Sequence, residues 1–263
     1  MLKFYKYHGT GNDFILLNNR DKTVVLNADD IRRLCDRRYG IGADGVILLN
    51  PSEQADFEMI FYNNDGSTDT FCGNGGRCIA AFAHHLEIMN ENGCFLASDG
   101  VHQAKIIAKS NQNDTVVRIS MKDCTIPQQF SDDTFFIHTG SPHLVIFNDD
   151  IAALDVPSLG AQYSNSPNIV GRTNVNFVEK HSNHLAVRTF ERGVEDETCS
   201  CGTGIVAAAL TYSAHFLKDT RQNVITVASR GGTLKVYYAQ TDNAFHDVYL
   251  EGKATLVFVG IRP

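Results

Sequence analysis

Two short segments of the sequence place a cysteine before glycines at the next and third positions. They are Cys72-Gly-Asn-Gly75 and Cys201-Gly-Thr-Gly204, and an apolar run of helical periodicity follows each. A helix start leaves N–H groups unpaired, carries about half a positive charge and binds anions such as an α-carboxylate. The same field lowers the pKa of a thiol from about 8.5, and glycines let a ligand approach the backbone. The sequence therefore predicts two anion-binding helix starts, each with a reactive thiol.

Two such thiols suit the inversion of a stereocentre. A thiolate on one face removes an α-proton, a thiol on the other face returns one, and the helix starts stabilise the charge that develops. We predict Cys72 and Cys201 as the catalytic bases, and expect no cofactor and no metal site because the chemistry requires neither. The remaining cysteines are predicted to be packing or surface thiols: Cys35, Cys78, Cys94, Cys124 and Cys199.

The two segments belong to an internal repeat with an offset of 129 positions. At this offset Thr10-Gly11 falls on Thr139-Gly140. Further identities match Gly42 with Gly171, Val46 with Val175, Phe61 with Phe190 and Ala80 with Ala209. A gap-free match of this length indicates that the chain is an internal duplication.

Most of each half has the β-branched and aromatic composition of strands. The predicted strands are 13–17, 45–49, 57–62, 94–109 (with a turn at 98–100), 115–121, 134–138, 143–147, 174–178, 184–190, 223–228, 232–239 and 248–260, with a hairpin turn at 231–232. A short helix is predicted at 28–38, after Asn27 as its cap. The helices that begin at the two cysteines are apolar around most of their circumference and must be buried.

These elements predict an α+β fold of two pseudo-symmetric domains, each an antiparallel sheet wrapped around a central helix. We place the N-terminal domain, with Cys72, at 1–122 and the C-terminal domain, with Cys201, at 123–253. The final strand, about 254–263, is expected to return to the first domain.

Composition excludes several classes of protein. The net charge is −7 with no basic stripe, which argues against nucleic acid, and no apolar run approaches the roughly 20 residues of a membrane span. An odd number of cysteines without small-domain spacing favours free thiols in a reducing cytoplasm. We expect a soluble cytoplasmic enzyme acting on a small molecule.

The sequence resembles the diaminopimelate epimerase family over nearly its whole length. The matching motifs are HGTGNDF, GIGADGVILL, YNNDGSTDTFCGNGGRC, TGSPH, GRTNVNF and ERGVEDETCSCGTG. The resemblance implies a cofactor-independent isomerase that interconverts LL- and meso-2,6-diaminopimelate in lysine and cell-wall precursor biosynthesis. It also implies a homodimer.

The family's site residues carry over to matching positions. The bases fall on Cys72 and Cys201, and the α-carboxylate cradle falls on Gly73, Asn74, Gly202 and Thr203. Recognition of the distal amino-acid end falls on Asn12, Asn63, Asn174 and Arg192, since a planar guanidinium binds a carboxylate through two hydrogen bonds. Glu191 matches a carboxylate near the ammonium group, and His143 a supporting group.

Two positions depart from the family pattern. Ser141 stands where the family often has Asn, so a shorter or water-mediated distal contact is expected there. The segment from Glu191 to Cys201 is one residue longer than usual and holds the acidic triplet Glu195-Asp196-Glu197, which we interpret as a loop insertion.

Two other functions stay open from the sequence. A proline or hydroxyproline racemase-like enzyme would share the paired thiols, but its ring substrate has no second carboxylate for Arg192. A thiol redox or binding protein would require ligand clusters or CxxC pairs, which the sequence lacks.

Overall fold

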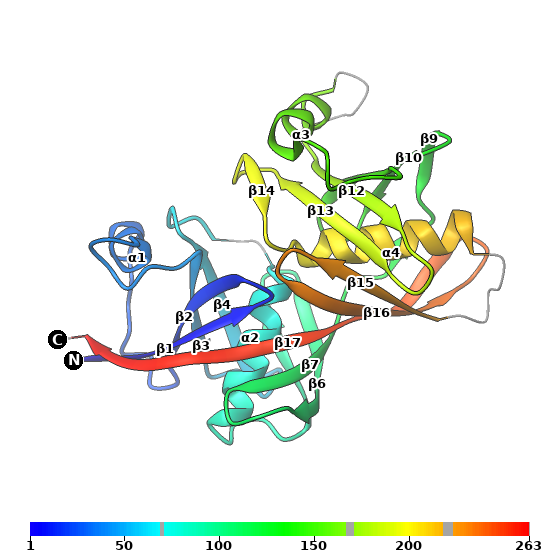
Figure 1. Ribbon diagram of the computed structural model, residues 1–263. Coiled ribbons are helices and arrows are strands. Elements are labelled where there is room, and N and C mark those ends of the chain that lie inside the picture. Colours follow the sequence, from blue (N-terminus) through cyan, green and yellow to red (C-terminus); the bar gives the residue numbers. More distant parts are fainter. Residues whose placement is uncertain (69–70, 167–170, 218–222, 263) are drawn as a thin grey trace. The chain divides into compact units, whose positions relative to one another are not determined.

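The computed structural model describes residues 1–68, 71–166, 171–217 and 223–262 (Figure 1). The chain divides into two compact units, Met1–Ile119 with Gly252–Pro263, and Ser120–Glu251. No helix within the described residues is long and apolar enough to cross a membrane.

Within the described residues, the first unit contains seven strands, two helices and the end of a strand that it shares with the second unit. The elements are β1 (Leu2–Gly9), β2 (Asn12–Asn18), α1 (Ala28–Cys35), β3 (Gly45–Asn50), β4 (Phe57–Asn63), α2 (Gly73–His85), β5 (Asn92–Ala97), β6 (Gly100–Lys109) and β7 (Asp114–Ser120).

The second unit has a similar order of elements. They are β8 (Cys124–Thr125), β9 (Gln128–Ser131), β10 (Thr134–His138), β11 (Pro142–Phe147), α3 (Val156–Ser164), β12 (Asn174–Lys180), β13 (Leu185–Glu191), β14 (Asp196–Thr198), α4 (Gly202–Phe216), β15 (Val224–Ser229), β16 (Gly232–Gln240) and β17 (Ala244–Arg262).

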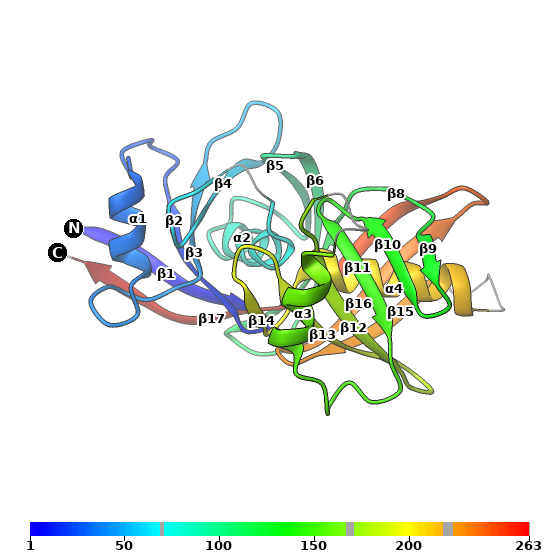
Figure 2. The same cartoon turned by 90° about the horizontal axis from the view of Figure 1, so that it is seen from above.

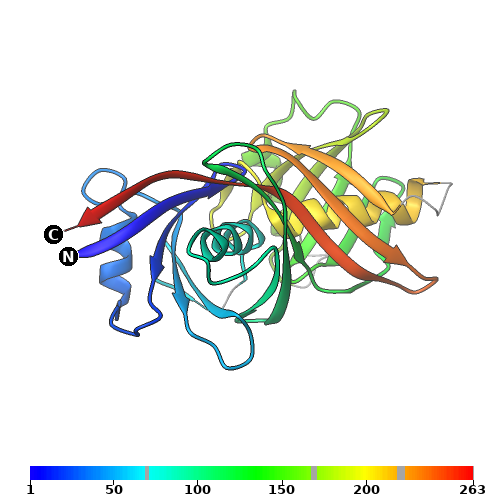
Figure 3. The ribbon, with the colours of Figure 1, turned by 90° about the horizontal axis from the view of Figure 1, so that it is seen from below.

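In each unit a closed sheet surrounds one helix. Strands β1 to β7 pair in sequence order, and β17 closes the ring by pairing with both β7 and β1. Helix α2 lies inside this ring (Figure 3), and its residues from Gly73 to Ala83 are buried. In the second unit β10 to β13 and β15 to β17 form the ring, and β8 and β9 complete it. Helix α4 is its buried central helix, as the apolar pattern predicts.

The prediction of two repeated domains, each a sheet around a central helix, is confirmed, but the sheets are mixed rather than antiparallel. Strand pairs β2–β3, β4–β5, β11–β12 and β13–β15 are parallel. A helix lies between the two strands of each pair along the chain, because a parallel pair requires a crossover connection (Figure 2). The apolar runs Phe14–Leu17 and Val46–Leu49 were a signal of this arrangement, since parallel strands are buried on both faces.

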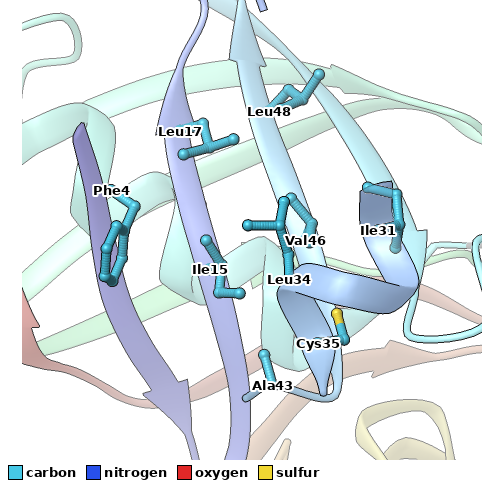
Figure 4. Packing of buried hydrophobic residues seen from close by; sticks show 9 residues of the cluster. All are labelled: Phe4, Ile15, Leu17, Ile31, Leu34, Cys35, Ala43, Val46 and Leu48. Carbon is cyan, nitrogen blue, oxygen red and sulfur yellow. The ribbon is translucent and has the colours of Figure 1, made fainter. Parts of the chain in front are cut away.

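Helix α1 supplies the cover on the outer face of the first ring. Its buried side chains Ile31, Leu34 and Cys35 pack against Ile15 and Val46 of the strands below (Figure 4). Asn27 caps the helix by accepting a hydrogen bond from Asp30 N, and the helix ends at Cys35, earlier than the predicted Arg38. Helix α3 covers a corresponding apolar cluster in the second unit.

The backbone preserves the repeat at its glycines. Gly42 and Gly171 have φ values of 79° and 80°, and Gly11 and Gly140 have 85° and 101°. Only glycine adopts these left-handed conformations without steric cost, so each turn had the same requirement in both halves.

The sequence patterns do not predict β1, α3 or the short strands β8, β9 and β14. Strand β1 lacks an uninterrupted apolar pattern because Lys6 lies within it. Lys6 is nevertheless buried, and its Nζ lies 2.6 Å from the Asp13 carboxylate. Helix α3 is short and contains Gly160, a poor helix former, in its interior. Tertiary packing therefore overrides local preference in these elements.

Strand β17 is longer than the predicted 248–260 and belongs to both units. Its first part, up to Glu251, pairs with β16, and its last part, from Gly252, pairs with β7 and β1. The segment that follows β7 correspondingly supplies β8 and β9 to the second ring. Each ring is thus closed by the segment that follows the last strand of the other repeat.

Candidate active site

Each of the two cysteines is the residue that immediately precedes a central helix. Cys72 is the N-cap of α2 and Cys201 the N-cap of α4, with φ, ψ of −112°, 112° and −104°, 113°. The first intrahelical hydrogen bonds are donated by Gly76 N and Ile205 N, at 2.8 and 2.9 Å. The N–H groups of the residues directly after each cysteine therefore lie outside the helical ladder, as an anion cradle requires.

The Cys72 thiol has polar neighbours on two sides. Its Sγ accepts a hydrogen bond from Gly75 N at 3.5 Å and donates to Asn12 Oδ1 at 3.5 Å. Asn12 occupies the start of β2, where the tight Thr10-Gly11 turn returns the chain toward α2. The thiol therefore has a donor for its anionic form and an acceptor for its protonated form.

A chain of hydrogen bonds continues from Asn12 in both directions. Asn12 Nδ2 donates to Asp44 Oδ2 at 2.8 Å, and Asn12 Oδ1 accepts from Asn74 Nδ2 at 3.2 Å. Asn74 Oδ1 in turn accepts from Arg77 Nη2 at 2.8 Å and from Thr10 Oγ1 at 3.2 Å. A carboxylate only accepts and a guanidinium only donates, so the two charged ends fix the orientation of both carboxamides.

Asn63 ends β4 in a turn. Its backbone N–H donates to Ser67 O at 2.8 Å and its Nδ2 donates to Ser67 Oγ at 3.1 Å. The structure places Asn63 opposite Gly45 in the β3–β4 ladder, at the same end of the strands as Asn12.

In the second unit the Cys201 thiol lies 3.5 Å from Thr203 Oγ1 and makes no side-chain cap. The Thr203 hydroxyl lies 2.9 Å from His143 Nε2 and 3.0 Å from Ser141 Oγ. Thr139, the repeat counterpart of Thr10, donates to Thr203 O at 2.9 Å. Ser141 therefore contacts Thr203, two positions after the thiol. It also accepts a hydrogen bond from Nδ2 of Asn174, a predicted distal-end residue, at 3.3 Å.

His143 is fully buried and its tautomer follows from its partners. Nδ1 accepts from Asn176 Nδ2 at 3.1 Å, and Asn176 is itself fixed by Leu144 O and the Thr189 hydroxyl. The ring proton therefore lies on Nε2, facing Ser141 and Thr203. Burial is the main cause that lowers the pKa of His143 to about 3, with smaller contributions from the charges of His138 and Arg192. His143 is thus a neutral donor at neutral pH.

The predicted distal-end residues of this unit gather at the ends of β12 and β13. Asn174 Oδ1 accepts from Arg192 N at 2.9 Å, and Arg192 Nη1 donates to Arg172 O at 3.0 Å. Among the residues that the structure describes, no carboxylate pairs with the Arg192 guanidinium, and the side chain is exposed. Glu191 is half-buried at the last position of β13. Arg192 is therefore available to a carboxylate ligand.

The acidic segment after Arg192, interpreted from the sequence as a loop, forms a β-hairpin. Strand β14 pairs with the end of β13, with Glu191 opposite Asp196. Glu195 pairs with Arg172, and Glu197 pairs with Arg188 at 2.8 Å and Arg230 at 2.9 Å. Glu195 and Glu197 thus both have basic partners.

Several residues in these networks have no assigned role in the sequence analysis: Thr10, Asp44, Arg77, Thr139 and Asn176. Thr10 and Thr139 coincide in the repeat, which was the available signal for both. Arg77 could have been recognised as a charged residue within a helix that must be buried. Asp44 and Asn176 lie within the motifs GIGADGVILL and GRTNVNF, which was the available signal for both, but neither coincides with a like residue in the repeat.

The comparisons with known proteins agree with the motifs. The family model for diaminopimelate epimerase matches residues 4–122 and 135–257. A diaminopimelate epimerase of Flavobacterium psychrophilum is 44% identical over 98% of both chains. One of Chlorobaculum tepidum is 40% identical over 96% of this chain and 98% of its own length. The chain belongs to the diaminopimelate epimerase family. The two segments of the family match fall on the two repeats.

Solved structures show that the fold of this diaminopimelate epimerase family member is shared more widely. A phenazine biosynthesis protein of the PhzF family from Bacillus anthracis has a TM-score of 0.74 at 14% identity, covering 98% of both chains. A probable proline racemase from Agrobacterium radiobacter has a TM-score of 0.71 at 14% identity, covering 100% of this chain and 93% of its own. At such identity the likeness concerns the fold alone.

Proposed function

We propose that this protein is a cofactor-independent diaminopimelate epimerase that interconverts LL- and meso-2,6-diaminopimelate. The observation that carries the proposal is the pair of Cys-Gly-x-Gly helix starts at equivalent positions of a duplicated chain. Its membership of the diaminopimelate epimerase family supports the same substrate. The proposed place in metabolism is lysine and cell-wall precursor biosynthesis.

The proposed reaction requires the two sulfur atoms to face opposite sides of one α-carbon. The thiolate of one cysteine takes the α-proton, so that a C–H bond breaks and an S–H bond forms. The electron pair moves into the α-carboxylate, and the thiol of the other cysteine then gives its proton to the opposite face. The pair Cys72 and Cys201 thereby exchanges charge states at each turnover.

The carboxylate would be held by the N–H groups of Gly73, Asn74, Gly202 and Thr203. These donors lie at or next to the first helical positions, where the helix dipole adds to each hydrogen bond. They stabilise the charge that enters the carboxylate when the proton leaves. No bound cofactor has a role in these steps.

The distal amino-acid end would bind Asn63, Asn174 and Arg192, together with Asn12. The uncompensated guanidinium of Arg192 suits a second carboxylate, and Glu191 at the adjacent position suits an ammonium group. His143 and Ser141 would support Thr203 through their hydrogen bonds to its hydroxyl. The proposed binding residues therefore form two groups, one for the reacting end of the substrate and one for its distal end.

Replacing Arg192 tests the substrate assignment. Loss of a charge-assisted pair with a distal carboxylate should reduce kcat/KM for diaminopimelate by roughly 30-fold to 1000-fold in Arg192→Ala. Arg230→Ala is the matched control, because Arg230 is exposed and already paired with Glu197. The wild type should barely act on L-lysine, which lacks the distal carboxylate, or on proline.

The same assay examines the proline racemase-like alternative and the two-thiol step. In heavy water, product should carry solvent deuterium at one α-carbon while unreacted substrate initially carries little, because separate thiols remove and return the proton. Brisk racemisation of proline by the wild type, unchanged in Arg192→Ala, would overturn the substrate assignment. Such a result would favour a ring substrate.

We also propose a cytoplasmic homodimer. The last part of β17 exposes large apolar side chains that a second subunit could cover: Val257, Phe258, Val259 and Ile261. The absence of disulfides among the described cysteines suits a reducing compartment. Light scattering should give twice the mass of the 29.0 kDa chain, and a monomer at assay concentration would contradict the dimer.

A further inference from the structure

Arg77 is a buried charge to which the proposed mechanism gives no role. It lies in the second turn of α2, is 0% exposed and is among the largest fully buried side chains. Nη1 donates to Gly73 O at 3.3 Å and Nη2 donates to Thr10 Oγ1 at 3.1 Å and Asn74 Oδ1 at 2.8 Å. Within the described part of the chain no carboxylate pairs with the guanidinium, and its Nε has no hydrogen-bond partner. Burial lowers the pKa of Arg77 to about 10, so it remains charged at neutral pH.

The other charged groups around this site compensate one another. Asp13 pairs with Lys6 at 2.6 Å and with Arg37 at 2.7 Å, and Arg37 also pairs with Asp44 at 2.7 Å. These two carboxylates and two cations leave no net charge. Tyr7 and Cys78 are neutral because burial raises the pKa of each group. Among the charged groups named here from the described residues, Arg77 is therefore the one without a partner of opposite charge.

The guanidinium reaches the thiol by two routes. It lies against Gly73 O, in the residue next to Cys72, and buried charges interact strongly because little water screens them. It also holds Asn74, whose Nδ2 fixes Asn12 Oδ1 beside the Cys72 sulfur. The repeat counterpart of Arg77 is Val206, which is buried on α4 and carries no charge. Helix α4 therefore has no cation at the position that corresponds to Arg77.

We propose that Arg77 is a positioning residue of the Cys72 half of the site, which fixes the Asn74 and Asn12 carboxamides and favours the thiolate of Cys72. Cys72 is then the more acidic of the two thiols and carries the negative charge in the resting enzyme, and Cys201 carries the proton. The catalytic significance of this inference rests on the proposed function. Its test measures the acidity of the two thiols and requires no substrate.

The test is alkylation of the substrate-free protein by iodoacetamide between pH 5 and 10, with the rate at each cysteine followed by peptide mass spectrometry. The pH midpoint of alkylation, rather than the rate, reports the thiol pKa and is independent of how accessible the sulfur is. In the wild type the Cys72 midpoint should lie at least about one pH unit below that of Cys201, a tenfold difference in thiolate population. The exposed thiol of Cys199 serves as an internal reference.

Arg77→Met removes the charge and keeps most of the volume. The Cys72 midpoint should rise by about one unit or more, while the midpoints of Cys201 and Cys199 stay in place. Arg77→Lys should restore part of the shift. A merely structural role would change stability and the accessibility of several thiols without moving one midpoint alone.

Three results would overturn the proposal. They are a wild-type Cys72 midpoint at or above that of Cys201, an unchanged Cys72 midpoint in folded Arg77→Met, and equal shifts of both thiols. If Arg77→Met does not fold, the proposal is still tested by the order of the Cys72 and Cys201 midpoints in the wild type and by the Cys72 midpoint in Arg77→Lys. Failure of the wild type to exchange the α-proton of diaminopimelate would instead contradict the proposed function and leave the Arg77 test intact.

Discussion

The starts of α2 and α4 have the same backbone design and different polar surroundings. Each begins with Cys-Gly-x-Gly after an extended N-cap, and each receives a threonine side chain from an equivalent turn, Thr10 or Thr139. Around Cys72 the network ends in a buried cation and a carboxylate. Beside Cys201 the Thr203 hydroxyl contacts two neutral side chains, Ser141 and His143.

The exchanged positions show how the difference arose within one scaffold. At the repeat offset Arg77 corresponds to Val206, His143 to Phe14 and Asn176 to Ile47. In each pair, a polar residue in one half corresponds to an apolar residue in the other. A buried polar group needs partners, and each half therefore carries its own complete set. The duplication kept the geometry and allowed the electrostatics to diverge, as the proposed pair of thiols with opposite charge states would require.

The largest expected effect comes from removing either thiol. In the proposed reaction one thiol removes the proton and the other returns it, so Cys72→Ala and Cys201→Ala should each lower epimerisation by about 10²–10⁴-fold or more. Circular dichroism should be unchanged in both. Substantial turnover by either variant would show that the halves are not equivalent partners and would end the two-thiol proposal.

The glycines three residues after the thiols should differ in their tolerance of alanine. A Cβ on Gly204 would lie 2.3 Å from Asn176 Oδ1, a buried carboxamide held by several partners. One on Gly75 would meet flexible ends of Ile47 and Met59 at 3.0 and 3.2 Å. Gly204→Ala should lower the free energy of unfolding by roughly 1–3 kcal/mol and reduce activity.

Gly75→Ala should change the free energy of unfolding by less than about 1 kcal/mol, because the helix propensity of alanine offsets the tighter packing. Urea denaturation of both variants measures the difference. Equal losses would mean that the Asn176 network is no more rigid than its apolar counterpart.

His143 should make the second half sensitive to acid. An unfolded histidine binds a proton below about pH 6.5, whereas burial holds the pKa of His143 at about 3, so the unfolded state gains protons first as the pH falls. Because of this residue, the free energy of unfolding of the wild type should fall by roughly 2 kcal/mol between pH 7 and pH 5. His143→Gln should lack that part of the decline.

Urea denaturation at pH 7 and pH 5 measures how much the free energy of unfolding falls in each protein. An identical fall in the wild type and His143→Gln would contradict a neutral buried imidazole. The first half has Phe14 at this position, which does not titrate.

The smallest effect on activity is expected at Cys35. It lies under α1 in the outer apolar cluster, and burial raises the pKa of its thiol to about 11. Cys35→Ala should therefore keep kcat/KM within a few-fold and lose about 1 kcal/mol of stability at most. A large loss of activity would mean that thiols outside the repeated positions contribute to the reaction.

Local sequence patterns were sufficient for much of the fold. The buried helices after Cys72 and Cys201, most strands of the rings and the repeat itself follow from apolar periodicity and from matched glycines. The family also follows, because its ordered motifs span both halves. These features depend on residues that are close in sequence or at a fixed offset, where spacing carries the information.

Other features were decided only by tertiary contacts. The parallel strand pairs and the closure of each ring by a segment following the other repeat depend on pairings between distant strands. The unequal surroundings of Cys72 and Cys201 arise because Arg77, Asp44, His143 and Asn176 meet from separate elements. Local propensity does not determine which distant side chains share a buried space, and the requirement that every buried polar group find a partner is satisfied only in the folded chain.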